Sequence, residues 1–185
     1  MKPITRLALL IAAGTALSLN AAELNIDKAA SSVAVDVKAS PPHEFTCDLQ
    51  DYDAKIGYDP GTNKITGAFF SFQLTDLETH NDKRNAKMQK WMDVDTYNTI
   101  TWELESVDEV DGKLVGHGVF IMHGEARPLD VIFTAVKEGD LVMLTGEADF
   151  NYMDYELPKI RLFVFTVKPE LHVHFELTGS VASQQ

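Results

Sequence analysis

Apolar residues recur at every second position over most of the chain, which is the period of β-strands that bury one face. In the segment SVAVDVKA, Val33, Val35 and Val37 alternate with small or charged residues. The same alternation recurs in segments that we expect to be strands, at residues 51–58, 65–74, 99–106, 113–123, 129–134, 141–150 and 171–178. The pattern therefore predicts at least seven strands.

Short polar segments separate these strands. DPGTN at 59–63, DEVDG at 108–112 and KEGD at 137–140 each contain a glycine, which tight reversals favour. A longer polar segment, HGEARP at 123–128, connects two apolar strands: Gly124 permits a tight backbone path, and Pro128 fixes the start of the next strand. Strands joined by such turns indicate an antiparallel barrel or sandwich rather than a βαβ fold.

One segment, NDKRNAKMQKWMDV at 81–94, has helical instead of alternating periodicity. Arg84, Met88, Trp91 and Met92 share one face of the predicted helix, while three lysines (residues 83, 87 and 90) can stay in solvent. Asn81 is the expected N-cap. A single short helix on a meander of strands often covers one mouth of a barrel, and we expect that position here.

Length and composition indicate one globular domain, because the chain has 185 residues of which 45% are hydrophobic and 24% charged. The first residues differ from the rest: Lys2 and Arg6 precede an apolar run and then small residues, as in a cleaved signal peptide. A membrane anchor fits less well, since the run is shorter than the roughly 20 residues that span a bilayer. We expect a signal peptide over residues 1–22 and a barrel domain over 23–185.

The charge of the chain excludes some partners. Loss of Lys2 and Arg6 with the signal peptide would change the formal net charge from -12 to -14. Nucleic acid is then a poor partner, and stable association with anionic membranes is disfavoured. Cys47 is the only cysteine, so no internal disulfide can form, and we expect a buried thiol. The sequence leaves the oligomeric state open, a homodimer included.

Two histidines invite a metal hypothesis. His172 and His174 lie two apart, so in a strand both imidazoles face one side and could supply two ligands of a tetrahedral metal. A periplasmic metal-binding module is therefore the alternative function. No second cluster has ligand spacing, and the pair shares its face with Glu176 and Thr178, as a solvated face would. We predict no native metal site.

Motifs of catalysis and of cofactor binding are missing from the sequence. There is no G-x-S-x-G elbow, no P-loop and no dinucleotide fingerprint, so neither an enzyme nor a cofactor is predicted. An isomerase or cyclase in a similar barrel would need a polar group in the lumen. His117 is the first candidate for that group if its strand register is shifted.

Large aromatic and thioether side chains fall on the faces that we expect to point inward. They fit a solid core, but an eight-stranded barrel is also wide enough to hold one ligand. Methionines beside aromatic rings make an adaptable apolar lining. The pattern of residues alone does not decide between a filled and a hollow barrel.

The segment GVFIMHGEARPLDVIF resembles part of the YceI-like family, in which a strand, a glycine, three residues and a proline lead into the next strand. Gly118, Phe120, Met122, Gly124 and Pro128 fall on that pattern. Other parts of the chain resemble further segments of the family, namely 84–107 its helix-to-strand segment, 26–37 its opening strand, and 147–160 with 171–177 its closing strands. The resemblance spans nearly the whole chain after the signal peptide.

Three departures from the family pattern stand out. Asn98 occupies a position where proline is usual, and Trp102 replaces a common phenylalanine. The charged R-D-x-H form of the helix start is here Arg84, Asn85, Ala86 and Lys87. The last departure affects the polar contact that this segment would make with the head group of a bound ligand.

The resemblance implies a lipocalin-like antiparallel β-barrel of about eight strands, exported to the periplasm and holding an isoprenoid chain such as a polyprenyl quinone without covalent chemistry. Each buried methylene is worth about 0.8 kcal/mol, so apolar walls alone can hold a few isoprene units. From strand and helix parity we expect the ligand to be lined by Phe70, Phe72, Leu74, Met88, Trp91, Met92, Ile100, Trp102, Phe120, Met122 and Phe133.

Overall fold

The computed structural model describes residues 22–162 and 165–181, so the predicted signal peptide lies outside the described residues except for Ala22. The elements in chain order are β1 (Ala22–Ile26), η1 (Lys28–Ala30), β2 (Ser32–Ser40), β3 (His43–Leu49), β4 (Asp53–Asp59), β5 (Lys64–Gln73), η2 (Leu74–Asp76), β6 (Leu77–Glu78), α1 (Asp82–Trp91), β7 (Thr99–Val110), β8 (Lys113–Met122), β9 (Glu125–Glu138), β10 (Leu141–Asn151), η3 (Tyr152–Tyr155), β11 (Arg161–Leu162), β12 (Phe165–Val167) and β13 (Glu170–Val181).

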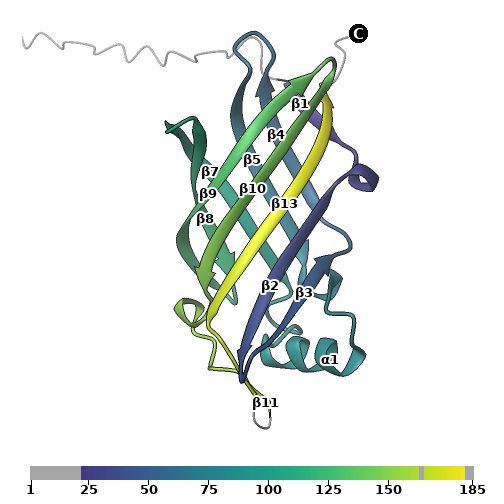
Figure 1. Ribbon diagram of the computed structural model, residues 1–185, viewed down its shortest axis with the longest axis vertical. Coiled ribbons are helices and arrows are strands. Elements are labelled where there is room, and N and C mark those ends of the chain that lie inside the picture. The colour runs from purple at the N-terminus through teal and green to yellow at the C-terminus, as the bar shows by residue number, and fades with distance from the viewer. Residues whose placement is uncertain (1–21, 163–164, 182–185) are drawn as a thin grey trace, which may run out of the picture.

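The strands form a closed antiparallel barrel (Figure 1). The barrel has eight strand positions around its axis, and two of them are each filled by two consecutive strands. β1 and β2 together fill the first position and β3 and β4 the second, because β2 pairs with β3 while β1 pairs with β4. β5, β7, β8, β9, β10 and β13 then follow in sequence order. Closure comes from β13, which pairs with both β2 and β1. The eight positions confirm the predicted lipocalin-like barrel.

The two ends of the barrel are built differently. Tight turns join β4 to β5, β7 to β8 and β9 to β10 at the upper end of Figure 1, whereas α1, η3 and the β11–β12 hairpin gather at the lower end. The Trp91 indole nitrogen donates to the Pro158 carbonyl at 2.8 Å, and its ring meets Tyr152 edge-on at 5.1 Å between centroids. These contacts hold α1 against the segment that follows η3, at one mouth of the barrel as predicted.

The helix begins and ends where local chemistry requires. The Asn81 side chain accepts a hydrogen bond from the Arg84 backbone nitrogen at 3.1 Å, which confirms the predicted N-cap. The helix ends at Trp91, short of the predicted residue 94, and Asp93 takes a left-handed φ of 49°. Among the described residues, no helix is long and apolar enough to cross a membrane.

The polar segment at 123–128 is not the long connection that the sequence suggested. The turn consists of His123 and Gly124, with φ of 53° and 78°, and β9 already begins at Glu125. Two-residue turns with positive φ match the right-handed twist of the strands that they join. Pro128 lies inside β9 opposite Val119 of β8, and the β9–β10 pairing covers only residues 132–138 of β9. A proline is tolerated there because that part of the strand has no β10 ladder to interrupt.

Strict alternation also fails within β7. Ile100 is buried, and Trp102 and Leu104 border the interior, as the sequence predicts. The β7–β8 register then shifts between Leu104 and Ser106. Up to Leu104 the even-numbered residues of β7 face the interior, but beyond the shift the odd-numbered Val107 packs against it. Such a bulge inserts one extra residue and moves the inward face to the other parity.

Candidate functional site

The barrel encloses an apolar cavity of about 270 Å³. Every strand from β2 to β10 and β13 contributes to its lining, together with α1 and the segment after η3. Among the described residues that line it, Thr79, Arg84 and Lys87 are the exceptions to a lining of hydrocarbon, aromatic and sulfur-containing side chains. The cavity is therefore suited to a hydrophobic molecule.

All eleven residues predicted to line a ligand border this cavity, and their contact with a ligand stays a prediction. The set is Phe70, Phe72, Leu74, Met88, Trp91, Met92, Ile100, Trp102, Phe120, Met122 and Phe133. For the residues on strands, the alternation of side chains was enough to predict this, because one face of each strand points toward the interior. The residues of α1 reach the same cavity because the helix lies across the mouth of the barrel.

Other lining residues did not emerge from the sequence. Phe45 and Cys47 come from β3, a strand that the pattern did not predict because His43-Glu44-Phe45-Thr46 shows no clear alternation. The valines of β2 did alternate, yet nothing in the sequence indicated that they face a cavity. Phe150 and Tyr152 stand at the end of β10 and the start of η3. The strand predicted over residues 141–150 ends at Asn151, and the segment after it forms η3 instead of continuing in the sheet.

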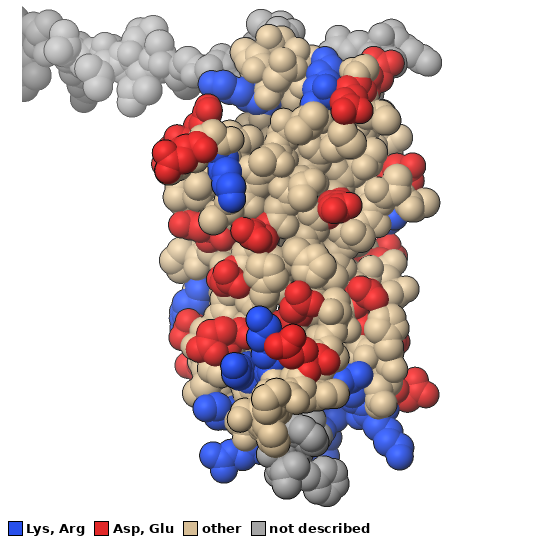
Figure 2. Space-filling model, in the orientation of Figure 1, with Lys and Arg blue, Asp and Glu red and all other residues tan. Residues whose placement is uncertain are grey.

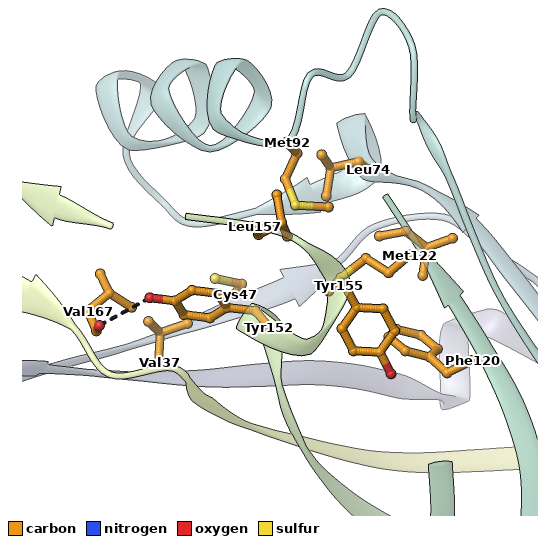
Figure 3. Close-up of a cluster of buried hydrophobic side chains, with 11 residues drawn as sticks. Val37, Cys47, Leu74, Met92, Phe120, Met122, Tyr152, Tyr155, Leu157 and Val167 are labelled. Carbon is orange, nitrogen blue, oxygen red and sulfur yellow. Dashed lines mark hydrogen bonds between the residues drawn. The ribbon is translucent and has the colours of Figure 1, made fainter. Parts of the chain in front are cut away.

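A cluster of buried side chains, most of them drawn in Figure 3, lies at the α1 end of the barrel and includes several aromatic rings. The rings of Phe120, Phe150 and Tyr155 lie within 5.2 to 5.9 Å of one another between centroids. Burial raises the pKa of the Tyr155 phenol to about 12, so this hydroxyl stays neutral. The Tyr152 hydroxyl donates to the Val167 carbonyl at 3.3 Å. These contacts pack η3 against β8, β10 and β12.

Cys47 is buried in the wall of the cavity, as the sequence predicts for the single cysteine. Burial raises the pKa of its thiol to about 12. A thiol with such a pKa is a poor nucleophile at neutral pH because only the thiolate reacts. The side chain therefore serves as a small apolar group of the lining.

Arg84 introduces charge at the α1 end of this apolar cavity. Its guanidinium carbon lies 3.8 Å from the centroid of the Phe45 ring, and one terminal nitrogen donates to the Thr79 carbonyl at 2.9 Å. The Arg84 Nε is buried and has no hydrogen-bond partner among the described residues. Lys87, one turn further along α1, is exposed as predicted and also borders the cavity.

Positive charge gathers around the same end of the molecule. Figure 2 shows lysine and arginine side chains at the lower end, where α1 lies, and acidic side chains scattered along the barrel wall. The lysines of α1 are exposed, as is Arg161 at the start of β11. Although the net charge of the chain is negative, the α1 end of the barrel is therefore locally basic.

The histidines singled out from the sequence lie on the outer surface. The His172 Nδ1 is 2.8 Å from Asp149, and the His174 Nε2 is 3.7 Å from Asp36, on neighbouring strands. Within residues 22–162 and 165–181, no group of three or more histidine, cysteine or acidic side chains could hold a metal ion. The geometry gives the metal alternative no support.

His117 does not point into the lumen, so the isomerase or cyclase hypothesis loses its first candidate. The His117 Nδ1 lies 2.7 Å from Asp130, and its Nε2 lies 3.3 Å from Asp108. The hydrogen bond to Asp130 is the main reason that the pKa of His117 is raised above its ordinary value of 6.5. The register of β8 directs this side chain outward because the even-numbered residues of the strand face inward.

Comparison with known proteins places this cavity in context. The family model described as YceI-like domain matches residues 24–179. A search of curated proteins finds no match. The family model therefore spans most of the described barrel.

Solved structures show the same fold. The crystal structure of Burkholderia cenocepacia BcnA has a TM-score of 0.74 and 18% identity, covering 83% of this chain and 99% of that one. A polyisoprenoid binding domain from Saccharophagus degradans, implicated in plant cell wall breakdown, has a TM-score of 0.65 and 14% identity, covering 86% and 99%. The Campylobacter jejuni YCEI protein has a TM-score of 0.62 and 16% identity, covering 74% and 85%.

Proposed function

Because the chain belongs to the YceI-like domain family, we propose that it is a periplasmic binding protein that holds an isoprenoid lipid in the lumen of its barrel. The lipid belongs to the class that includes polyprenyl quinones and similar amphiphiles. Binding shields the apolar chain from water for carriage or storage, and no covalent chemistry takes place.

The apolar cavity is the observation that carries this proposal. Its lining is almost wholly hydrocarbon and aromatic, and two tryptophans and three methionines are spread along it. Burial of an isoprenoid chain against such walls yields about 0.8 kcal/mol for each methylene, although ordering the flexible chain offsets much of that gain. Flexible thioethers let the lining adjust to the branched methyl groups of the chain.

Two further observations support the proposal that the barrel binds a lipid. One solved structure of the same fold is described as a polyisoprenoid binding domain, which makes this ligand class the first to test. The described lining contains no carboxylate and no imidazole, the groups that most often transfer protons in enzymes. A binding role fits this lining better than a catalytic one.

The direct test is lipid extraction from native protein. Protein purified without detergent should release a stoichiometric prenyl lipid into organic solvent, identified by mass spectrometry. Protein unfolded, washed free of lipid and refolded should be empty, and should take up added polyprenyl quinone. Repeated recovery of empty native protein, with no uptake by the refolded sample, would refute the proposal.

The location is tested separately. The residues before Ala22 have the pattern of a signal peptide, which supports export. Cell fractionation should find the protein in the periplasmic extract, and N-terminal sequencing should start near residue 22 or 23. Recovery of a full-length chain from the cytoplasm would contradict the periplasmic part of the proposal while leaving lipid binding open.

A further inference from the structure

The lumen is short compared with a long polyprenyl chain. On β13 its lining runs from Leu171 to Leu177, which corresponds to about 20 Å at the usual rise of a strand. An isoprene unit has four chain bonds where a residue has three, so an extended unit adds roughly 4.5 Å. The lumen therefore holds about four extended units. Because an eight-stranded barrel is just wide enough for one ligand, a longer chain cannot fold back beside itself and must leave the lumen.

Side chains fill the upper end of the barrel. Leu24, Tyr58 and Val142 are buried there, with at most 2% of each residue exposed, and they do not border the cavity. They come from β1, β4 and β10, so this packing joins several strands of the wall. The Tyr58 hydroxyl donates to the Asn63 side chain at 2.7 Å, which holds the ring in place. A long chain therefore cannot leave along the barrel axis at this end.

Two neighbouring strands of the wall, β5 and β7, are joined over part of their length. The ladder between them ends at the pair of Phe69 and Glu103, although β5 begins at Lys64 and β7 continues to Val110. Above that pair each strand stays with its hairpin partner, β5 with β4 and β7 with β8. Figure 1 shows the turns of these two hairpins apart at the upper end. The two hairpins therefore diverge above the ladder.

The cavity extends to the outer face of the wall where these strands diverge. Successive residues of a strand point to opposite faces, so Phe69 points outward between the inward-facing Ala68 and Phe70. All three border the cavity, as do Ile65 on β5 and Leu104 on β7. These residues form an apolar passage through the wall, which we call the side opening.

The two exits from the lumen differ in chemistry. Arg84 and Lys87 border the cavity at the α1 end, whereas apolar side chains form the side opening. Contact with a hydrocarbon chain would deprive the two cations of water, but it would bury the apolar side chains at a gain in free energy. The side opening is therefore the better exit for the surplus isoprene units of a long chain.

We propose that the side opening binds the distal part of a long polyprenyl chain, which passes from the lumen between β5 and β7 and lies against Phe69. This inference rests on the proposed function and makes it sharper, because the ligand class becomes polyprenyl compounds with more isoprene units than the lumen holds. Shorter prenyl chains stay inside the lumen and do not reach Phe69.

Two prenyl alcohols of different length test the proposal. The chain of geranylgeraniol matches the lumen, whereas that of solanesol is about twice as long. Protein freed of lipid by unfolding and refolding is offered an equal mixture of both alcohols in detergent micelles. Mass spectrometry after gel filtration measures the ratio of the two alcohols bound to the protein. The wild type should retain solanesol at least as well as geranylgeraniol.

The variant Phe69→Ala should lower the bound ratio of solanesol to geranylgeraniol about fivefold, because each buried methylene changes an affinity roughly fourfold and the phenyl ring covers at least one. The affinity for geranylgeraniol should stay within about twofold of the wild type, since its chain does not reach the ring. The matched control is Ile132→Ala, which removes an exposed apolar side chain from the outer face of β9 and should keep the ratio. Circular dichroism of each variant verifies the fold.

A photoreactive chain locates the exit directly. A hexaprenol with a diazirine at its far end extends about two units beyond the length of the lumen. After irradiation, peptide mapping by mass spectrometry should place the label on residues 64–69 or 104–107. Label on α1 would show that the chain leaves through the other mouth, and label on the side chains of the closed upper end would show that it stays inside. Either result overturns the inference.

The outcomes separate this inference from the proposed function. Exclusion of solanesol by a wild type that retains geranylgeraniol overturns the role of the side opening but leaves lipid binding intact. An unchanged ratio in a folded Phe69→Ala protein also overturns the inference, and the position of the photolabel decides if that variant does not fold. Failure of the wild type to retain either alcohol overturns the proposed function itself.

Discussion

The Trp102 indole lies directly against Gly118, where a side chain carbon would be 2.7 Å from the indole Cε2. The same carbon would be 2.5 Å from the Glu103 carbonyl oxygen. The indole cannot move away freely, since its nitrogen donates to the Leu129 carbonyl at 3.1 Å. Position 118 therefore has room for hydrogen alone, because Trp102 fills the adjoining space.

We expect Gly118→Ala to lower the free energy of unfolding by about 3 kcal/mol, because overpacking of a tight interior displaces side chains and backbone. Trp102 fluorescence should shift as its ring moves. Gly67→Ala is the matched control, since a side chain carbon at Gly67 would meet nothing within 4 Å. Denaturant titration measures both, and an equal effect of the two variants would contradict the packing argument.

Filling the lumen should block ligand binding without unfolding the barrel. Ala148 borders the cavity from β10, so Ala148→Phe would occupy space that the lipid needs. We expect at least a tenfold loss of affinity for a prenyl ligand, a change of about 1.4 kcal/mol. Thr145→Phe places the same ring on the exposed side of the same strand and should bind normally. Unchanged binding by a folded Ala148→Phe protein would show that the ligand lies elsewhere.

The Asn85 amide links α1 to β6 and to Thr79 through three hydrogen bonds. Asn85 donates to Glu78 at 2.6 Å and accepts from the Thr79 backbone and hydroxyl at 2.9 and 2.6 Å. The hydrogen bond from Asn85 is the main reason that the pKa of Glu78 is lowered. An aspartate at this position would set two carboxylates against each other.

We expect Asn85→Asp to lower the melting temperature at neutral pH. In the wild type, the lowered pKa of Glu78 contributes stability above its ordinary value of 4.5, and this stability is lost as the pH falls through the folded pKa. The variant should recover part of its deficit in acid, where one carboxylate becomes protonated. Adding Glu78→Gln should also restore stability near neutrality. A deficit that neither acid nor the second substitution relieves would contradict the proposed repulsion.

Cys47 should react very slowly with thiol reagents. With a pKa of about 12, about one thiol in ten thousand is ionised at pH 8. We expect labelling at least a hundredfold slower than that of a free cysteine, with a rate that rises as the pH increases. The same protein in denaturant should label at the ordinary rate. Fast labelling of the folded protein would show that the wall of the cavity opens readily.

His117 should make stability depend on pH. Its folded pKa is raised above 6.5, mainly by the hydrogen bond to Asp130, so the protonated form is favoured in the folded state. The resulting stabilisation is fully present below the ordinary pKa and is lost as the pH rises through the higher folded pKa. The melting temperature of the wild type should therefore exceed that of His117→Gln most in mild acid, and the difference should shrink as the pH rises.

Titration of the imidazole by nuclear magnetic resonance measures the His117 pKa directly. The variant Asp130→Asn should lower this pKa relative to the wild type, because the main cause of the shift has been removed. A His117 pKa that does not respond to Asp130→Asn would contradict the assignment of the cause.

The sequence by itself determined most of the long strands and turns and the inward faces of those strands, with β3 missed. Alternation of apolar residues is a local property, because each residue in a strand points to the side opposite its neighbours. The inward direction of Phe70, Phe120 and Phe133 followed from parity alone, whereas the cavity that they border did not. Asn81 could be identified as the N-cap for the same reason, since capping depends on the backbone of the next three residues.

Tertiary structure decided what depends on contacts between distant segments. Closure of the barrel joins β1 to β13 across almost the whole chain, and only the closed ring creates a lumen. The bulge that brings Val107 inward and the pairing that admits Pro128 within β9 both depend on a neighbouring strand. The clearest case is Arg84, which the sequence places on the apolar face of a helix. Its unpartnered Nε becomes evident only when α1 covers the mouth and β3 supplies Phe45 beneath the guanidinium.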